Sequence, residues 1–195
     1  MEQLALFSEA GQSKGIPTHL LDYRAGLFNQ TESDTLLAKF IRETPWKQTR
    51  QKLWEKEYLT PRLTCWYGET ARIAGTLPWT PELQAIREIV EPLVGITFNS
   101  VLLNYYRDGN DSVAWHSDKE SIMGSQPVIA SVSFGQVRCF DIRNKTDHKE
   151  RYSIKLEHGS FLLMKAGLQE HWEHRISKST RPMKARVNLT FRLVI

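Results

Sequence analysis

The chain has 195 residues, a net charge of +4, 41% hydrophobic and 25% charged residues, which is the composition of an ordinary globular protein with one domain. No apolar run approaches the roughly 20 residues that span a bilayer, so the sequence excludes a membrane helix. Residues 1–15 lack the basic and apolar regions of a secretory signal, and we expect a cytoplasmic protein, also nuclear if the source is eukaryotic. The two cysteines, Cys65 and Cys139, are expected to be reduced thiols in the core or near the site.

Two helices are expected in the first half of the chain. Ser33–Glu43 places its hydrophobic side chains on one helical face, with Thr31 or Ser33 as the N-terminal cap. Thr80–Val94 is expected to be the second helix, because Pro81 suits a first helical turn.

From Phe98 onward the pattern predicts strands. Short runs rich in Val, Ile, Phe, Ser and Thr are separated by Gly, Asn and Asp, which is typical of strands joined by turns. Two helices followed by many strands favour a mainly β fold with flanking helices. We expect one domain over residues 19–195, after a flexible leader at residues 1–18.

His116 and Asp118 are the most informative pair in the sequence. Side chains two residues apart on a strand point to the same side, so this imidazole and this carboxylate can bind one metal ion. Two histidines and one carboxylate are the ligands of non-haem iron(II) oxygenases. Taken alone the pair is weak evidence, because chance and surface hydrogen bonding often produce it. The third ligand is sought downstream, where His171 and His174 are both candidates.

The run from Arg186 to Arg192 alternates strictly between polar and apolar residues. Two arginines on the inner face of a strand would be costly unless they met an anion, and a dicarboxylate would be such an anion. Asn104 and Tyr106 also share one face of an expected strand and offer donors to a carboxylate. Taken alone, each segment is better interpreted as an amphipathic strand with one wet side, but together they favour a binding site.

With these motifs in this order, the chain resembles the AlkB-type iron(II) and 2-oxoglutarate-dependent dioxygenases, in their nucleic-acid repair branch. The resemblance covers about residues 61–192. It rests on six segments, which are Pro61–Glu69, Asn104–Asp108, Trp115–Glu120, Ile129–Gly135, His158–Ser160 and Arg186–Arg192. The resemblance implies a double-stranded β-helix, or jelly-roll, core.

The resemblance also implies a role for each motif residue. His116, Asp118 and His174 match the iron(II) ligands, with His174 favoured over His171 by its distance before Arg186. Arg186 matches the residue that pairs with the distal carboxylate of 2-oxoglutarate, since a guanidinium fork meets a carboxylate with two hydrogen bonds. The further cosubstrate contacts implied are Asn104, Tyr106, Asn188 and Arg192.

The implied reaction is oxidative demethylation. Oxygen hydroxylates a methyl carbon on a base nitrogen while 2-oxoglutarate is decarboxylated to succinate, and the product loses formaldehyde. Residues 61–79 are implied to form a lid that recognises the target nucleotide. The expected substrate contacts are Arg62, Trp66, Tyr67 and Glu120, whereas Trp79 is expected to pack in the core. Residues 70–75 depart from the aromatic segment of the relatives, which leaves the clamp on the base open.

Basic residues gather in two clusters, which favours a polyanionic partner. The clusters are Lys47, Arg50, Lys52, Lys56, Arg62 and Arg72, and then Arg175, Lys178, Arg181 and Lys184. We predict a monomer that demethylates 1-methyladenine and 3-methylcytosine in DNA or RNA, preferably in single strands. Two alternatives are a dioxygenase acting on a protein side chain and an iron-free module of the same fold that binds nucleic acid.

Overall fold

A computed structural model describes residues 17–53, 56–69, 73–118, 121–124 and 126–195. The leader predicted for residues 1–18 lies outside this part of the chain except for its last two residues. None of the helices in the described ranges is long and apolar enough to cross a membrane.

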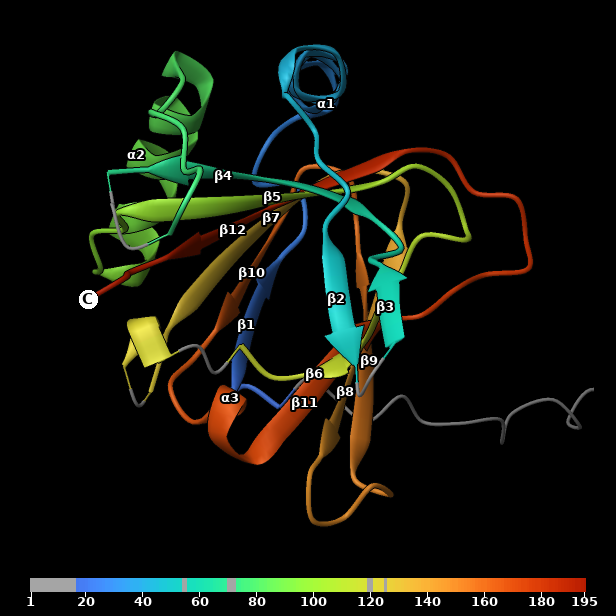
Figure 1. Ribbon diagram of the computed structural model, residues 1–195. Helices are drawn as coiled ribbons and strands as arrows, with labels where there is room; N and C mark the ends of the chain where they lie inside the picture. Colours follow the sequence, from blue (N-terminus) through green and yellow to red (C-terminus); the bar gives the residue numbers. More distant parts are fainter. Residues whose placement is uncertain (1–16, 54–55, 70–72, 119–120, 125) are drawn as a thin grey trace, which may run out of the picture.

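Two antiparallel sheets face each other in the centre of the molecule (Figure 1). The larger has the strand order β1-β10-β7-β12-β5-β4, and the smaller has the order β6-β11-β8-β9. The strands of the larger sheet are β1 (Leu21–Arg24), β4 (Leu63–Gly68), β5 (Ser100–Tyr106), β7 (Ile129–Gly135), β10 (Ser160–Met164) and β12 (Arg186–Arg192). Those of the smaller sheet are β6 (Val113–His116), β8 (Arg138–Asn144), β9 (Arg151–Leu156) and β11 (Trp172–Ile176). The predicted mainly β, double-stranded β-helix fold is confirmed.

Two helices, α1 (Gln30–Glu43) and α2 (Pro81–Val94), cover the outer face of the larger sheet (Figure 1). The sequence placed the start of α1 too late. Its cap is Asn29, whose side chain accepts from the backbone N–H of Glu32 at 3.0 Å, while the Glu32 carboxylate accepts from the backbone N–H of Asn29. The bounds of α2 agree with the prediction, with Thr80 as cap.

The alternating side chains of the larger sheet separate two hydrophobic cores. On β12, Val187, Leu189 and Phe191 pack beneath the helices, together with Phe134 of β7 and Leu83 of α2. A second core fills the space between the two sheets and includes Phe140, Ile142 and Trp172 of the smaller sheet. The polar side of β12 therefore faces the interior between the sheets, where a site can be enclosed.

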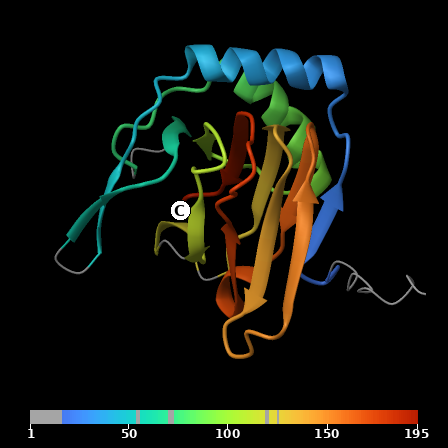
Figure 2. The ribbon, with the colours of Figure 1, turned by 90° about the vertical axis from the view of Figure 1, so that its right-hand side faces the viewer.

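A hairpin of β2 (Arg50–Leu53) and β3 (Lys56–Leu59) projects from the two sheets (Figures 1 and 2). This basic and polar run lacks the apolar alternation of a strand, so its sequence did not predict the hairpin. The described chain is completed by the short helices η1 (Ser121–Met123) and α3 (Leu168–His171).

The stretch predicted to be a lid, residues 61–79, has a different arrangement. Its first part is β4, which pairs with β5 from Leu63 opposite Tyr105 to Gly68 opposite Ser100. This part is therefore a strand of the larger sheet, and sheet hydrogen bonds hold its backbone in place. The lid role stays a prediction for residues 61–79.

Candidate active site

A cavity of about 200 Å³ lies between the two sheets. The larger sheet contributes the polar face of β12 and the side chains of Asn104 and Tyr106 on β5. The smaller sheet contributes His116 of β6 and His174 of β11, together with apolar side chains such as Phe140. Residues that the sequence identified separately thus line one cavity.

The structure brings three of the predicted ligands together. His174 lies opposite His116 in the register of β11 and β6. The nitrogen and oxygen atoms that His116, Asp118 and His174 offer to a metal all lie within 4.8 Å of one another. His171, in contrast, ends α3 with its side chain exposed to solvent and is outside this group.

Asp118 reaches this position by a route that the sequence did not indicate. Strand β6 ends at His116, so the pleat of one strand does not orient both side chains as predicted. The backbone N–H of Asp118 instead donates to Oε1 of the fully buried Gln169 at 2.9 Å. The hydroxyl of Ser117 also donates to the carbonyl of Trp172 at 2.8 Å. These two bonds fix the turn after β6 against the start of β11.

The electrostatics of the three side chains suit a cation. Nδ1 of His116 lies 2.9 Å from the carbonyl oxygen of Ala114, which can only accept, so the neutral ring carries its proton on Nδ1 and presents the Nε2 lone pair. Burial and then the adjacent His116 lower the pKa of His174 to about 3, which leaves that imidazole neutral. Burial opposes ionisation of Asp118, but Arg192 and His116 outweigh it and hold the pKa of this carboxyl far below its usual range.

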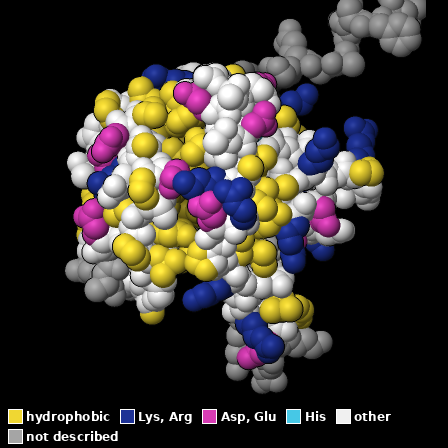
Figure 3. Space-filling view, turned by 90° about the horizontal axis from the view of Figure 1, so that it is seen from above, with side chains coloured by type: hydrophobic (Ala, Val, Ile, Leu, Met, Phe, Trp, Pro, Cys, Tyr) yellow, Lys and Arg dark blue, Asp and Glu magenta, His cyan; other side chains and the backbone are white. Residues whose placement is uncertain are grey.

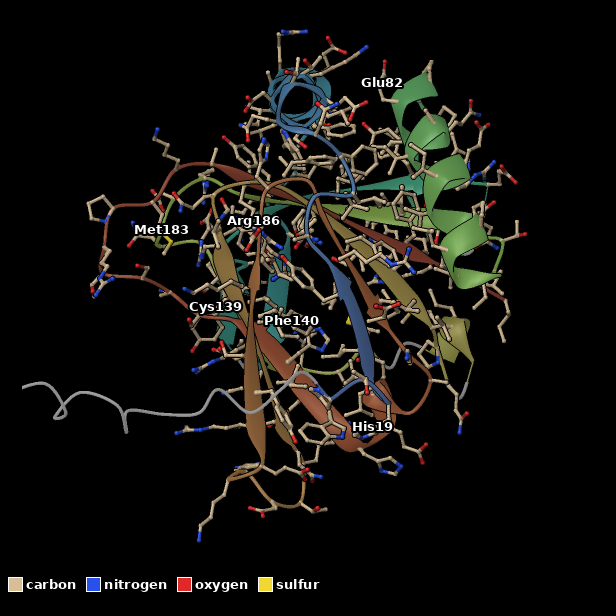
Figure 4. All side chains as sticks on the ribbon, turned by 180° about the vertical axis from the view of Figure 1, so that it is seen from behind. His19, Glu82, Cys139, Phe140, Met183 and Arg186 are labelled. Atoms are coloured by element: carbon tan, nitrogen blue, oxygen red, sulfur yellow. The ribbon has the colours of Figure 1, made fainter. Side chains whose placement is uncertain are left out.

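Arg186 of β12 also lines the cavity and is buried, with 1% of its surface exposed (Figure 4). Its Nη2 donates to Oγ of Ser133 at 2.9 Å, and its Cζ lies 5.0 Å from the centre of the Tyr106 ring. Nε and Nη1 have no hydrogen-bond partner among the described residues. Burial lowers the pKa of Arg186 to about 10, so the group is still charged at neutral pH. A buried charge with two free donors fits an anion with two oxygens, such as a carboxylate.

The other predicted cosubstrate residues line the same cavity. Nδ2 of Asn188 donates to Oγ of Ser131 at 2.7 Å, which fixes the orientation of the amide. Oδ1 of Asn104 accepts from Nε of Arg62 at 2.9 Å. Arg62, which the sequence assigned to the substrate, therefore contacts one of the residues assigned to the cosubstrate.

Arg192 contacts both the candidate metal ligand Asp118 and the ring of Trp66. Its Nη2 lies 3.1 Å from Oδ2 of Asp118, and its Cζ lies 5.0 Å from the centre of the Trp66 ring. Nε of Arg192 is buried without a hydrogen-bond partner in the described chain. Trp66 is thus placed on the site side of β4, next to the cavity lining.

Tyr67, which the sequence assigned to the substrate, lies on the side of β4 that faces away from the cavity. Adjacent residues on a strand point to opposite faces, and Trp66 is the one that faces the site. Tyr67 is 5% exposed within the core beneath the helices, where burial is the main cause that raises its pKa to about 12. Its side chain is therefore not among the residues that line the cavity between the sheets.

Three further predictions have different outcomes. Glu120 lies outside the described residues. Trp79 packs in the core as expected, stacked on Phe191 with ring centres 6.3 Å apart. Both cysteines are free, but Cys139 is exposed on the surface and not in the core or the site.

The second basic cluster is accessible. Lys178, Arg181 and Lys184 are exposed along the loop between β11 and β12, whereas Nε of Arg175 lies 3.0 Å from Oδ2 of Asp141. In the first cluster, Lys47 and Arg50 are exposed. Arg72 and the side chains of Lys52 and Lys56 lie outside the description.

The comparison with protein families decides the relationship. The model of the 2OG-Fe(II) oxygenase superfamily matches residues 21–192. This chain belongs to the 2OG-Fe(II) oxygenase superfamily. The iron(II) in the superfamily's name fits the donor set of His116, Asp118 and His174. The 2-oxoglutarate fits the incompletely paired guanidinium of Arg186. A solved structure described as "The structure of OsALKBH1" has the same fold, with a TM-score of 0.64 at 15% identity over 88% of this chain and 97% of that one.

Curated relatives place the chain among the AlkB-type members of the superfamily. It is 40% identical to alpha-ketoglutarate-dependent dioxygenase alkB homolog 3 of Rattus norvegicus, over 87% of this chain and 62% of the relative. The homolog 3 of Homo sapiens is 39% identical, over 87% and 64%. The DNA oxidative demethylase ALKBH2 of Mus musculus is 34% identical, over 87% and 78%. The chain thus spans slightly less than two thirds of the length of the homolog 3 relatives.

Proposed function

We propose that this protein is an iron(II)- and 2-oxoglutarate-dependent dioxygenase that demethylates 1-methyladenine and 3-methylcytosine in DNA or RNA, with single strands preferred. The observation that carries the proposal is that three metal-binding side chains and the two free donors of Arg186 face one cavity. The names of the relatives support it, since they describe a dioxygenase and a DNA oxidative demethylase.

His116, Asp118 and His174 would hold the iron ion. Bound iron(II) and 2-oxoglutarate supply the oxidising power, and each turnover converts O2, 2-oxoglutarate and an N-methyl group into succinate, carbon dioxide and an N-hydroxymethyl group. The hydroxymethyl group then leaves as formaldehyde, and the unmodified base remains. The protein's own task is to bind, orient and exclude water.

Several polar residues of the cavity have a defined part in that task. Arg186 binds the distal carboxylate with the guanidinium N–H donors that the hydrogen bond to Ser133 leaves free. Asn104, Tyr106 and Asn188 supply further polar contacts to the same molecule. Arg192 keeps the Asp118 carboxylate ionised and oriented. Apolar lining residues, among them Phe140, Leu156 and Met164, limit the entry of water.

The substrate enters beside β4 and β6. Arg62 and Trp66 are proposed to contact the target nucleotide, and Glu120 remains a proposed contact. The projecting hairpin adds Tyr58 and Leu59, which are 51% and 55% exposed. Large exposed apolar side chains on a projecting element are suited to stacking against an extruded base and its neighbours.

Mass spectrometry of a methylated oligonucleotide panel tests this proposal. The panel contains 1-methyladenine or 3-methylcytosine in single- and double-stranded DNA and RNA, and a methylated peptide is the competing substrate. We expect loss of the methyl group from single-stranded oligonucleotides in the presence of iron(II), 2-oxoglutarate and oxygen, and none with Asp118→Ala. Demethylation or hydroxylation of the peptide alone would replace the nucleic-acid substrate by a protein.

A further inference from the structure

The outer face of the smaller sheet, turned away from the cavity, carries an unusual set of side chains. β6 contributes Trp115, β11 contributes Arg175, β8 contributes Arg143, and β9 contributes Arg151 and Lys155. We call these five residues the outer arginine face. Figure 2 shows β8 and β9 on the near side of the molecule, where neither α1 nor α2 covers them.

Two arginines of this face make cation–π contacts with the ring of Trp115. The Cζ atoms of Arg143 and Arg175 lie 4.2 and 4.5 Å from the centre of the Trp115 ring. Such contacts hold a guanidinium in place without using its N–H donors. The two arginines come from different strands, so they are preorganised as a pair beside one aromatic ring.

The cations of this face exceed its carboxylates. Asp141 is occupied by Nε of Arg175 at 3.0 Å and by the hydroxyl of Ser153 at 2.8 Å. Glu173 is occupied by Nε of Arg143 at 2.5 Å. Arg151 and Lys155 have exposed side chains and no ion-pair partner in the described part of the chain. The face therefore attracts anions, and its own carboxylates are already occupied.

A hollow of about 330 Å³ opens on the same face. Its lining includes the Trp115 ring, the cations Arg151 and Arg175, and the hydroxyl of Ser153. An aromatic side chain among cations is the combination with which proteins bind single-stranded nucleic acid, by stacking on bases and contacting phosphates.

The outer arginine face is close to the proposed active site along the chain. Trp115 directly precedes His116, and β6 is the edge strand of its sheet. The two side chains lie on opposite sides of the strand, since His116 lines the cavity. A nucleic-acid strand with one base in the cavity can therefore continue around the edge at β6.

We propose that the outer arginine face is a second binding surface for single-stranded nucleic acid, which holds the phosphates and one base of nucleotides that flank the target. This proposal rests on the proposed function, because it assigns the substrate an extended path. It predicts that long substrates bind more tightly than short ones through contacts outside the cavity.

Arg151→Glu tests the surface, with Arg42→Glu as a matched control. Arg42→Glu changes the charge by the same amount on α1, and charges of both signs are mixed on that side of the molecule (Figure 3). Fluorescence anisotropy with a long single-stranded oligonucleotide should show Arg151→Glu binding about tenfold more weakly, or about 1.4 kcal/mol. The slope of log affinity against log salt should fall by about 0.7 for the lost phosphate contact. Arg42→Glu should change neither, and turnover of a methylated trinucleotide should be equal in all three proteins.

Equal effects of Arg151→Glu and Arg42→Glu, or no effect of either, would overturn the proposal, since only net charge would then matter. A failure of the proposed function has a different outcome. In that case the wild-type protein demethylates neither the trinucleotide nor the oligonucleotide, whereas the difference between the two variants in binding persists.

Discussion

Replacement of Arg186 by methionine should change stability in opposite directions with and without cosubstrate. The wild-type guanidinium is fully buried and has two donors without partners in the described structure. Burial lowers its pKa from the ordinary value of an arginine to about 10. At about 1.4 kcal/mol per pKa unit, the charged form costs the fold on the order of 3 kcal/mol below that pH. The hydrogen bond to Ser133 stabilises the folded state by about 1 kcal/mol and offsets part of this cost.

Arg186→Met should therefore unfold at the same temperature as the wild type or a higher one when no cosubstrate is present. A saturating ligand at about 100 times its dissociation constant stabilises a protein by about 2.7 kcal/mol. For a domain of this size that corresponds to roughly 5 to 10 °C in melting temperature. We expect this shift in the wild type and none in the methionine variant.

Thermal unfolding with and without 2-oxoglutarate, in the presence of manganese(II) to prevent turnover, measures both effects. Arg186→Lys is the matched control, because it keeps the charge and loses the planar fork. Its affinity for 2-oxoglutarate should fall roughly ten- to a hundredfold. Equal thermal shifts in the wild type and Arg186→Met would refute the assignment of Arg186 to the cosubstrate.

Three further predictions concern the ligands, the core and pH. His174→Ala should abolish iron binding measured by metal analysis while His171→Ala retains it, and the reverse pattern would make His171 the ligand. Tyr67→Phe should lower the free energy of unfolding in urea by about 1 kcal/mol and leave turnover of a methylated oligonucleotide unchanged, so a large fall in turnover would return Tyr67 to the site. Burial opposes the ionisation of Asp111, but hydrogen bonds from Arg107 outweigh it and lower the pKa of Asp111 in the folded state. The ionised group therefore stabilises the fold above its unfolded pKa, so Asp111→Asn should destabilise most near neutral pH and progressively less below about pH 4, and a difference independent of pH would contradict this.

Local sequence patterns predicted those parts of the site in which one strand carries several residues. The alternation from Arg186 to Arg192 placed both arginines on the inner face of β12, and in the structure both line the cavity. The same reasoning did not distinguish Tyr67 from Trp66, because alternation separates two neighbours without saying which of them faces the cavity. Tyr67 packs in the core beneath α1 and α2, and this packing leaves Trp66 on the side of β4 that faces the site.

A long-range contact explains one feature of the site that the sequence could not predict, and two local features were also missed. Asp118 is positioned by Gln169, which is far away in the chain and has no motif of its own. The start of α1 was missed although Asn29 and Glu32 have the spacing of a capping box. The β2–β3 hairpin pairs only with itself in a two-stranded sheet, and its basic and polar sequence resembled that of a loop.

An oligonucleotide labelled with carbon-13 in the methyl group of 1-methyladenine gives the most direct test of the central claim. The protein is incubated with the labelled single strand, iron(II), 2-oxoglutarate and oxygen, and formaldehyde and succinate are quantified together. We predict labelled formaldehyde and succinate in equal amounts, with neither product formed by Asp118→Ala. Succinate formation without labelled formaldehyde, together with an intact methyl group on the oligonucleotide, would contradict the proposed nucleic-acid demethylase.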